Sequence, residues 1–213
     1  MRNFLRATMV ALAALAFAPS PLLAQSAAPS FDCKKAASAV EKLICANKGL
    51  SQLDRETTQL FTTARDNAGD ARIGVIESQR RWVQARNDCA TSTDKDRCLV
   101  ESYVGRISDL RRQFAAARQV KGSVSLGPFV AQCDRGDPLS VAFVNTDPSY
   151  VFIGTAKTAF VLQQAISGSG ARYEAQYPKG QARLWNKGDD ATIALPGERD
   201  MNCTLKLTTQ VPN

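Results

Sequence analysis

The sequence predicts an α+β protein of two separate domains: a small disulfide-stapled helical bundle, then an antiparallel β-sandwich or barrel. Three observations predict this. Apolar residues recur every three to four positions up to about residue 119 and every second position beyond about residue 128. The second half contains about eight short apolar segments at roughly ten-residue spacing, which is typical of a sandwich or barrel. All six cysteines lie beyond residue 30, and an even count favours disulfides in an exported chain.

Residues 1–24 are predicted to be a secretory signal peptide. Arg2 and Arg6 make a basic start, and the apolar, alanine-rich run at 8–18 is followed by the small residue Ala24. The run is too short to span a bilayer, and no other segment is long and apolar enough to do so. No cysteine lies near the cleavage point, so no lipid anchor is expected there. We therefore expect a periplasmic or secreted protein.

Residues 25–119 are predicted to form the helical domain, with helices at about 32–46, 50–66, 71–89 and 96–118. The last helix has the clearest pattern, because its apolar residues recur at steps of three and four and share one face. These residues are Leu99, Tyr103, Ile107, Leu110 and Phe114.

Four cysteines, Cys33, Cys45, Cys89 and Cys98, fall in this domain. If Cys33 and Cys45 belong to one helix, their Cα atoms lie roughly 18 Å apart, too far for a disulfide. We therefore expect each of them to bond to Cys89 or Cys98, stapling the first helix to the turn between the third and fourth. The sequence does not decide between the two pairings.

Residues 120–128 are predicted to be a linker, because Gly, Ser and Pro replace helix formers there. Residues 129–213 then form the strand-rich domain. Cys133 lies in its first predicted strand and Cys203 in its last, so a bond between them would tie the two edges of the sheet together. In the chain-entropy model, a link across such a loop contributes roughly 4 kcal/mol.

The composition excludes the commonest catalytic arrangements. The chain has no histidine, which rules out Ser-His-Asp and Cys-His catalysts and disfavours a metal site at the widely spaced cysteines. No glycine-rich phosphate loop follows a strand and opens a helix. We therefore expect no catalytic residues, no metal and no cofactor.

The charge is uneven between the two domains. Residues 25–123 carry 17 basic and 12 acidic side chains, whereas residues 124–213 carry eight of each. In an exported protein, this charge serves solubility or attracts the anionic polymers of the cell envelope, rather than nucleic acid. Peptidoglycan is therefore one candidate partner of the helical domain.

Two motifs follow one another in the second half, Ser169-Gly-Ala-Arg-Tyr173 and Leu184-Trp-Asn-Lys-Gly-Asp189, and a closing Asn202-Cys-Thr-Leu205 completes the set. With these parts, the region from Phe129 to Leu205 resembles the periplasmic and membrane-bound inhibitors of c-type lysozyme (MliC/PliC-like). The resemblance implies an eight-stranded antiparallel β-barrel.

The resemblance also implies that Ser169 and Lys187 enter the lysozyme cleft, with Ser167 as a neighbour that could share the contact. A lysozyme cleft holds a glutamic acid of raised pKa and an ionised aspartate. A serine hydroxyl can donate and accept, and a lysine ammonium can pair with the ionised carboxylate. On local sequence alone, both residues are ordinary turn residues.

Four further residues of the two motifs are expected to support the loops rather than bind the target. Gly170 and Gly188 allow the backbone to turn. Tyr173 and Trp185 are expected to be core residues or loop supports.

The helical half contains five short motifs: Ser30-Phe-Asp-Cys33, Glu41-Lys-Leu-Ile-Cys45, Leu50-Ser-Gln-Leu-Asp54, Gln79-Arg-Arg-Trp82 and Arg86-Asn-Asp-Cys89. In these five motifs, the helical half is similar to the LprI-like module of other proposed lysozyme inhibitors. The sequence as a whole predicts a non-enzymatic inhibitor of c-type lysozyme that protects bacterial peptidoglycan. The alternative is a cell-envelope binding module without lysozyme inhibition.

Overall fold

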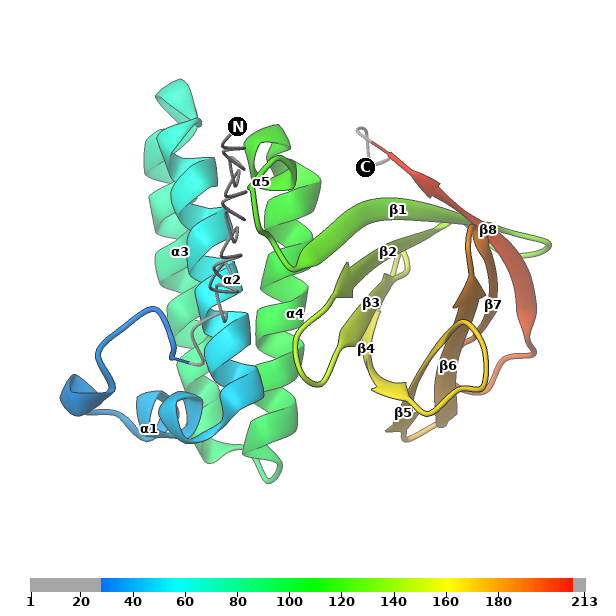
Figure 1. Ribbon diagram of the computed structural model, residues 1–213, viewed down its shortest axis with the longest axis horizontal. Coiled ribbons are helices and arrows are strands. Elements are labelled where there is room, and N and C mark those ends of the chain that lie inside the picture. The colour runs from blue at the N-terminus through cyan, green and yellow to red at the C-terminus, as the bar shows by residue number, and fades with distance from the viewer. Residues whose placement is uncertain (1–27, 209–213) are drawn as a thin grey trace, which may run out of the picture.

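A helical module and a closed β-barrel lie side by side in the computed structural model, which describes residues 28–208 (Figure 1). The predicted signal peptide lies outside these residues. Within the described part of the chain, no helix is long and apolar enough to cross a membrane.

The helical module contains α1 (Ala39–Ala46), α2 (Lys48–Asp66), α3 (Arg72–Asn87), α4 (Lys95–Gln113) and α5 (Ala115–Arg118), with short 3-10 turns η1 (Cys33–Lys35), η2 (Gly69–Ala71) and η3 (Asp88–Thr91). Side chains of Ser38, Asn47 and Asp94 cap the first turns of α1, α2 and α4 by accepting backbone hydrogen bonds. The predicted helix at 96–118 is divided because Phe114 leaves the helical region, at φ −121° and ψ 116°.

The disulfide pairing expected for this module is wrong. Cys33 bonds to Cys45 and Cys89 bonds to Cys98, with Cα–Cα distances of 5.8 and 5.6 Å. The prediction failed because Cys33 does not belong to the helix that contains Cys45. It lies in η1, and the chain turns back at Ala36 before α1 begins after its Ser38 cap. Each disulfide therefore ties a helix to its own preceding turn.

The barrel is closed and antiparallel, with its strands in chain order. The strands are β1 (Ser125–Cys133), β2 (Leu139–Val144), β3 (Tyr150–Gly154), β4 (Ala159–Ala165), β5 (Ala171–Tyr177), β6 (Gly180–Lys187), β7 (Asp190–Ala194) and β8 (Met201–Leu207). β1 pairs with β8, and the predicted Cys133–Cys203 disulfide joins two residues directly opposite in that pair. β1 begins at Ser125, within the range expected to be a linker.

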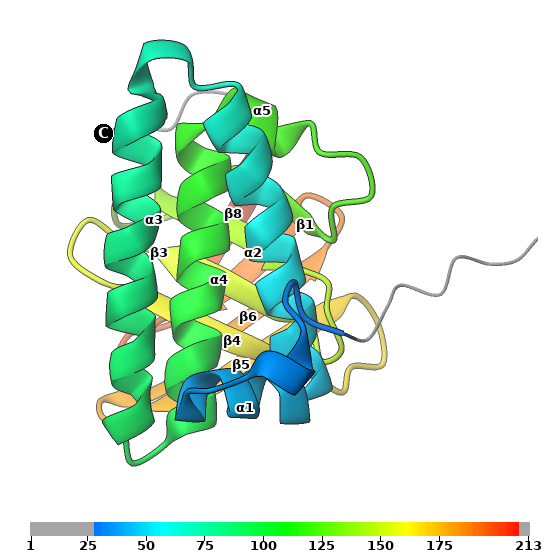
Figure 2. The ribbon, with the colours of Figure 1, turned by 90° about the vertical axis from the view of Figure 1, so that its left-hand side faces the viewer.

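The helices cover one wall of the barrel. Figure 2 shows α2, α3 and α4 side by side, crossing the strands behind them. Outward-facing residues of β2 to β4 belong to the same hydrophobic cluster as the helical core, among them Val144, Tyr150, Phe152 and Val161. Val144 is apolar although it lies on the outer face of the barrel, because the helices bury it.

A buried polar network joins the two modules at the start of β1. The Glu56 carboxylate on α2 accepts hydrogen bonds from the hydroxyls of Ser123 and Ser125, both at 2.5 Å. From α4, Arg111 donates to the carbonyl of Gly127 at 3.0 Å and to the Ser125 hydroxyl at 3.3 Å. Burial lowers the pKa of Arg111, and the charge of Glu56 opposes that shift. The segment that connects the helical module to the barrel is therefore bonded to both α2 and α4.

Candidate functional site

The two predicted target-binding loops leave the barrel at the same end. Residues 166–170 connect β4 to β5, and Gly188 and Asp189 form the two-residue turn between β6 and β7. Because β5 and β6 are paired, with Ala171 opposite Asn186, the loop that precedes β5 and the turn that follows β6 lie at one rim. We call this end the Ser169 rim (Figure 1).

The loop around Ser169 is held through its backbone. The Ser169 carbonyl accepts hydrogen bonds from the Trp185 indole N–H at 2.8 Å and from the Ser167 hydroxyl at 2.7 Å. Ser167 is thereby committed to the loop itself. The Ser169 side chain is exposed, and within residues 28–208 its hydroxyl has no hydrogen-bond partner.

Gly170 lets this loop lie directly against β6. Its φ is +66°, a conformation that favours glycine. A Cβ at this position would come within 2.4 Å of the Asn186 carbonyl oxygen. Only glycine therefore permits this close contact between the Ser169 loop and the residue that precedes Lys187.

Lys187 is presented by a tight hairpin. It pairs with Asp190 across the turn, and Gly188 takes the positive φ, +65°, that a type II′ turn requires at its first central position. The Leu205 N–H donates to the Asp189 carbonyl at 2.7 Å, which fastens the turn to β8. The Lys187 ammonium is exposed, and no ion-pair or hydrogen-bond partner contacts it among the described residues.

The two aromatic residues of the motifs occupy opposite sides of the barrel wall. Tyr173 points inward, is 4% exposed and packs against Phe143 with ring centroids 5.7 Å apart. Burial raises the pKa of its hydroxyl. Trp185 points outward, is 42% exposed, and supports the Ser169 loop through its N–H.

A groove runs along the outer wall beside the Ser169 loop and has a volume of about 590 Å³. We call it the Trp185 groove. Its lining residues come from the β4–β5 loop, β5, β6, β7 and the segment before β8: Ile166, Ser167, Gly168, Ser169, Arg172, Arg183, Trp185, Thr192, Ala194 and Asp200. Sequence reasoning missed this groove because the strand register, rather than any local motif, assembles it.

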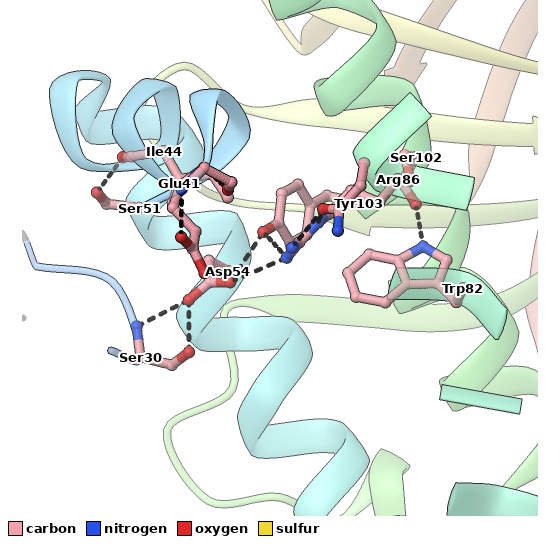
Figure 3. Close-up of polar contacts among 11 residues, drawn as sticks. Ser30, Glu41, Ile44, Ser51, Asp54, Trp82, Arg86, Ser102 and Tyr103 are labelled. Atoms are coloured by element: carbon pink, nitrogen blue, oxygen red, sulfur yellow. Dashed lines mark hydrogen bonds and ion pairs between the residues drawn. The ribbon is translucent and has the colours of Figure 1, made fainter. Parts of the chain in front are cut away.

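The helical module contains a cluster of ionisable side chains, drawn in Figure 3. The Asp54 carboxylate accepts from the Tyr103 hydroxyl at 2.8 Å and from the backbone N–H and hydroxyl of Ser30 at 2.8 and 2.5 Å. Arg86 donates to the same Tyr103 hydroxyl at 2.9 Å. Burial, together with the charge of Asp54, raises the pKa of Tyr103.

This cluster is a structural support rather than an open site. The side chains of Asp54 and Arg86 are only 7% and 10% exposed. Trp82 stacks edge-on against Tyr103 and donates its indole N–H to the Ser102 carbonyl at 3.2 Å. Both Asp54 carboxylate oxygens and the Tyr103 hydroxyl are bonded within the cluster, and Arg86 also donates to the Asn87 side chain. The cluster therefore ties Ser30 and three helices together.

The comparisons with known proteins agree with this architecture. Residues 132–202 match the family of the membrane-bound lysozyme inhibitor of c-type lysozyme, MliC. Over 169 residues the chain is 28% identical to lipoprotein LprI of Mycobacterium bovis and of Mycobacterium tuberculosis, which covers 79% of this chain and 82% of each relative. The chain is therefore similar to LprI over most of its length, and its barrel contains a region that matches the MliC family. The MliC match contains both Ser169 and Lys187, and an alignment of 169 residues is longer than either module. No solved structure matches the chain.

The match to this inhibitor family and the three disulfides indicate an extracytoplasmic protein. All six cysteines are paired, and no group of three or more His, Cys, Asp or Glu side chains within residues 28–208 is arranged to hold a metal ion.

Proposed function

We propose that this protein inhibits c-type lysozyme by inserting the Ser169 loop and the Lys187 turn into the catalytic cleft. It acts in the periplasm or after secretion, has no catalytic activity of its own, and protects peptidoglycan. The observation that carries the proposal is the Ser169 rim. There, the barrel presents one hydroxyl and one ammonium that have no partner among residues 28–208, each on a loop that is fixed by hydrogen bonds of its backbone.

The chemistry of the two groups suits the two catalytic carboxyl groups. Lysozyme needs one protonated and one ionised carboxyl group. The Ser169 hydroxyl can accept from the protonated group or donate to either one. The Lys187 ammonium supplies charge-assisted hydrogen bonds to the ionised group. Together they exclude water and sugar without a covalent step.

The rigidity of the rim favours tight binding. Association is weakened by the entropy lost when loops and side chains become ordered. The Ser169 carbonyl has two donors and the Asp189 carbonyl is tied to β8, so both loops are already ordered before the target arrives. Most of the entropy cost of ordering these two loops is therefore met during folding rather than on binding.

The test is lysozyme inhibition by the mature full chain and three variants. Lys187→Ala should weaken binding by roughly 2–5 kcal/mol, the range for truncating one member of a desolvated charge pair. Ser169→Ala should weaken it by about 0.5–1.5 kcal/mol, the range for a typical hydrogen bond. Lys157→Ala is the matched control, because this exposed lysine lies in the β3–β4 loop at the opposite end of the barrel.

Equal inhibition by the wild type and a Ser169→Ala/Lys187→Ala protein would contradict the insertion of these two groups. If the protein instead sediments with purified peptidoglycan and leaves lysozyme activity unchanged, it is an envelope-binding module.

A further inference from the structure

Two side chains cannot supply a stable interface with lysozyme. A typical specific protein–protein interface buries about 800 Å² on each partner. A binding surface built around the Ser169 rim must therefore include neighbouring residues, and the structure offers two flanks. One flank is the polar surface of α2 beside the β2–β3 loop, where Lys48 pairs with Asp147 at 3.0 Å. The other is the Trp185 groove.

Exposed apolar side chains distinguish the groove. Ile166, at the start of the β4–β5 loop, is 98% exposed, and Trp185 is 42% exposed. Both line this groove, next to Ser169. The other large exposed apolar residues lie outside it: Ile73 on α3, Leu126 on β1 and Leu207 on β8. An isoleucine almost completely in water gains more from burial by a partner than from any contact within the fold.

The charges that line the groove are compensated. Arg172 is paired with Glu174, its Nε donating at 2.6 Å, and Arg183 is paired with Asp200 at 2.8 Å. The groove therefore offers apolar surface and balanced charge to its occupant. An uncharged, partly apolar protein segment fits this chemistry.

The groove and the Ser169 loop are joined directly. The indole N–H of Trp185 donates to the Ser169 carbonyl, so a ring that lines the groove also positions the loop. A partner that receives Ser169 therefore meets the groove directly beside it, because Ser169 and Trp185 line the same groove. Aromatic and arginine side chains of this kind are enriched among the residues that dominate interface energies.

We propose that the Trp185 groove seats an uncharged, partly apolar segment of the lysozyme surface that borders the cleft, with Ile166 as its main apolar anchor. The proposal rests on the proposed function and extends the contact from two inserted groups to the outer wall of β5–β7.

The test measures the affinity of the mature full chain for c-type lysozyme by calorimetry. Ile166→Ser should raise Kd by about 10- to 100-fold, the loss of one buried aliphatic side chain. Ile166→Leu keeps the apolar area and should stay within about threefold of the wild type. Ile73→Ser is the matched control: it makes the same change at a side chain 71% exposed on α3, and it should leave Kd unchanged.

The outcomes separate the two proposals. If Ser169→Ala/Lys187→Ala loses affinity while Ile166→Ser stays within twofold of the wild type, the groove is not part of the interface and the proposed function stands. If the double variant binds as the wild type does, the proposed function itself fails. If the protein without lysozyme binds a soluble N-acetylglucosamine oligomer and Ile166→Ser weakens that binding, the groove is a saccharide site and this inference is overturned.

Discussion

Single residues of the Ser169 rim show how a turn sequence becomes a binding surface. Ser169 and Lys187 are ordinary turn residues in the local sequence, and neither is unusual in its own backbone conformation. They differ from other turn residues because neighbouring groups fix their loops, while their side chains have no partner in the described part of the chain. Gly170 and Trp185 do most of this, one through close approach to β6 and the other through its indole N–H.

A matched pair of glycine substitutions tests the close approach. Gly170 and Gly188 have nearly equal φ values, +66° and +65°, so alanine at either position adds a similar backbone strain of about 1–2 kcal/mol. Only at Gly170 would the new Cβ meet the Asn186 carbonyl; at Gly188 nothing lies within 4 Å. We expect Gly170→Ala to lower the free energy of unfolding in urea by about 1–3 kcal/mol more than Gly188→Ala. Equal losses would show that the contact with Asn186 is not constraining.

At the scale of elements, the caps and the disulfides determine where helices begin. Ser38 and Glu41 form a capping box on α1, in which the Glu41 carboxylate accepts from the N–H groups of Ser38 and Ala37, both at 2.9 Å. The Ser-x-x-Glu pattern was visible in the sequence. This pattern places the start of α1 at Ala39, after Cys33. The two cysteines then do not share a helix, and the distance argument against a Cys33–Cys45 bond no longer applies.

The same cap predicts a pH dependence. The backbone N–H groups of Ser38 and Ala37 lower the pKa of Glu41. Because its folded pKa lies below the unfolded value of about 4.3, its charged contribution to stability is present above that value and is lost as the pH falls through the folded pKa.

Glu41→Gln keeps a hydrogen-bond acceptor but removes the ionisation. Between pH 7 and pH 3, the wild type should therefore lose more free energy of unfolding than Glu41→Gln, as measured by urea titration at each pH. Equal losses would mean that the Glu41 carboxyl group has the same pKa in the folded and the unfolded protein.

At the scale of the whole molecule, the two modules share a hydrophobic cluster and a buried polar network. Strand alternation and helical periodicity are local patterns, so they predicted a helical module followed by an antiparallel sandwich or barrel with a Cys133–Cys203 link. The family resemblance then favoured the barrel. The sequence did not predict the covered wall of β2 to β4, which depends on what packs there. The apolar Ala142 and Val144 on the outward face were a signal that this wall is buried, and the polar network around Glu56 explains why the connection does not act as a loose tether.

Shared packing predicts that both modules unfold together. Trp82 belongs to the helical module and Trp185 to the barrel, and the chain has no other tryptophan. In a Trp82→Phe protein, fluorescence reports on the barrel, while circular dichroism at about 222 nm reports mainly on the helices. The two unfolding curves in urea should coincide, as two-state behaviour requires. A helical transition clearly separated from the fluorescence transition would show that the modules are independent.

The central claim is that the Ser169 rim occupies the lysozyme cleft. The most direct measurement is a titration of c-type lysozyme with the mature protein at increasing concentrations of an N-acetylglucosamine oligomer that fills the cleft. Blockage of the cleft predicts competition: the apparent Kd rises in proportion to the oligomer once the oligomer saturates the enzyme. An apparent Kd that stays constant, with protein and oligomer bound to lysozyme together, would contradict it.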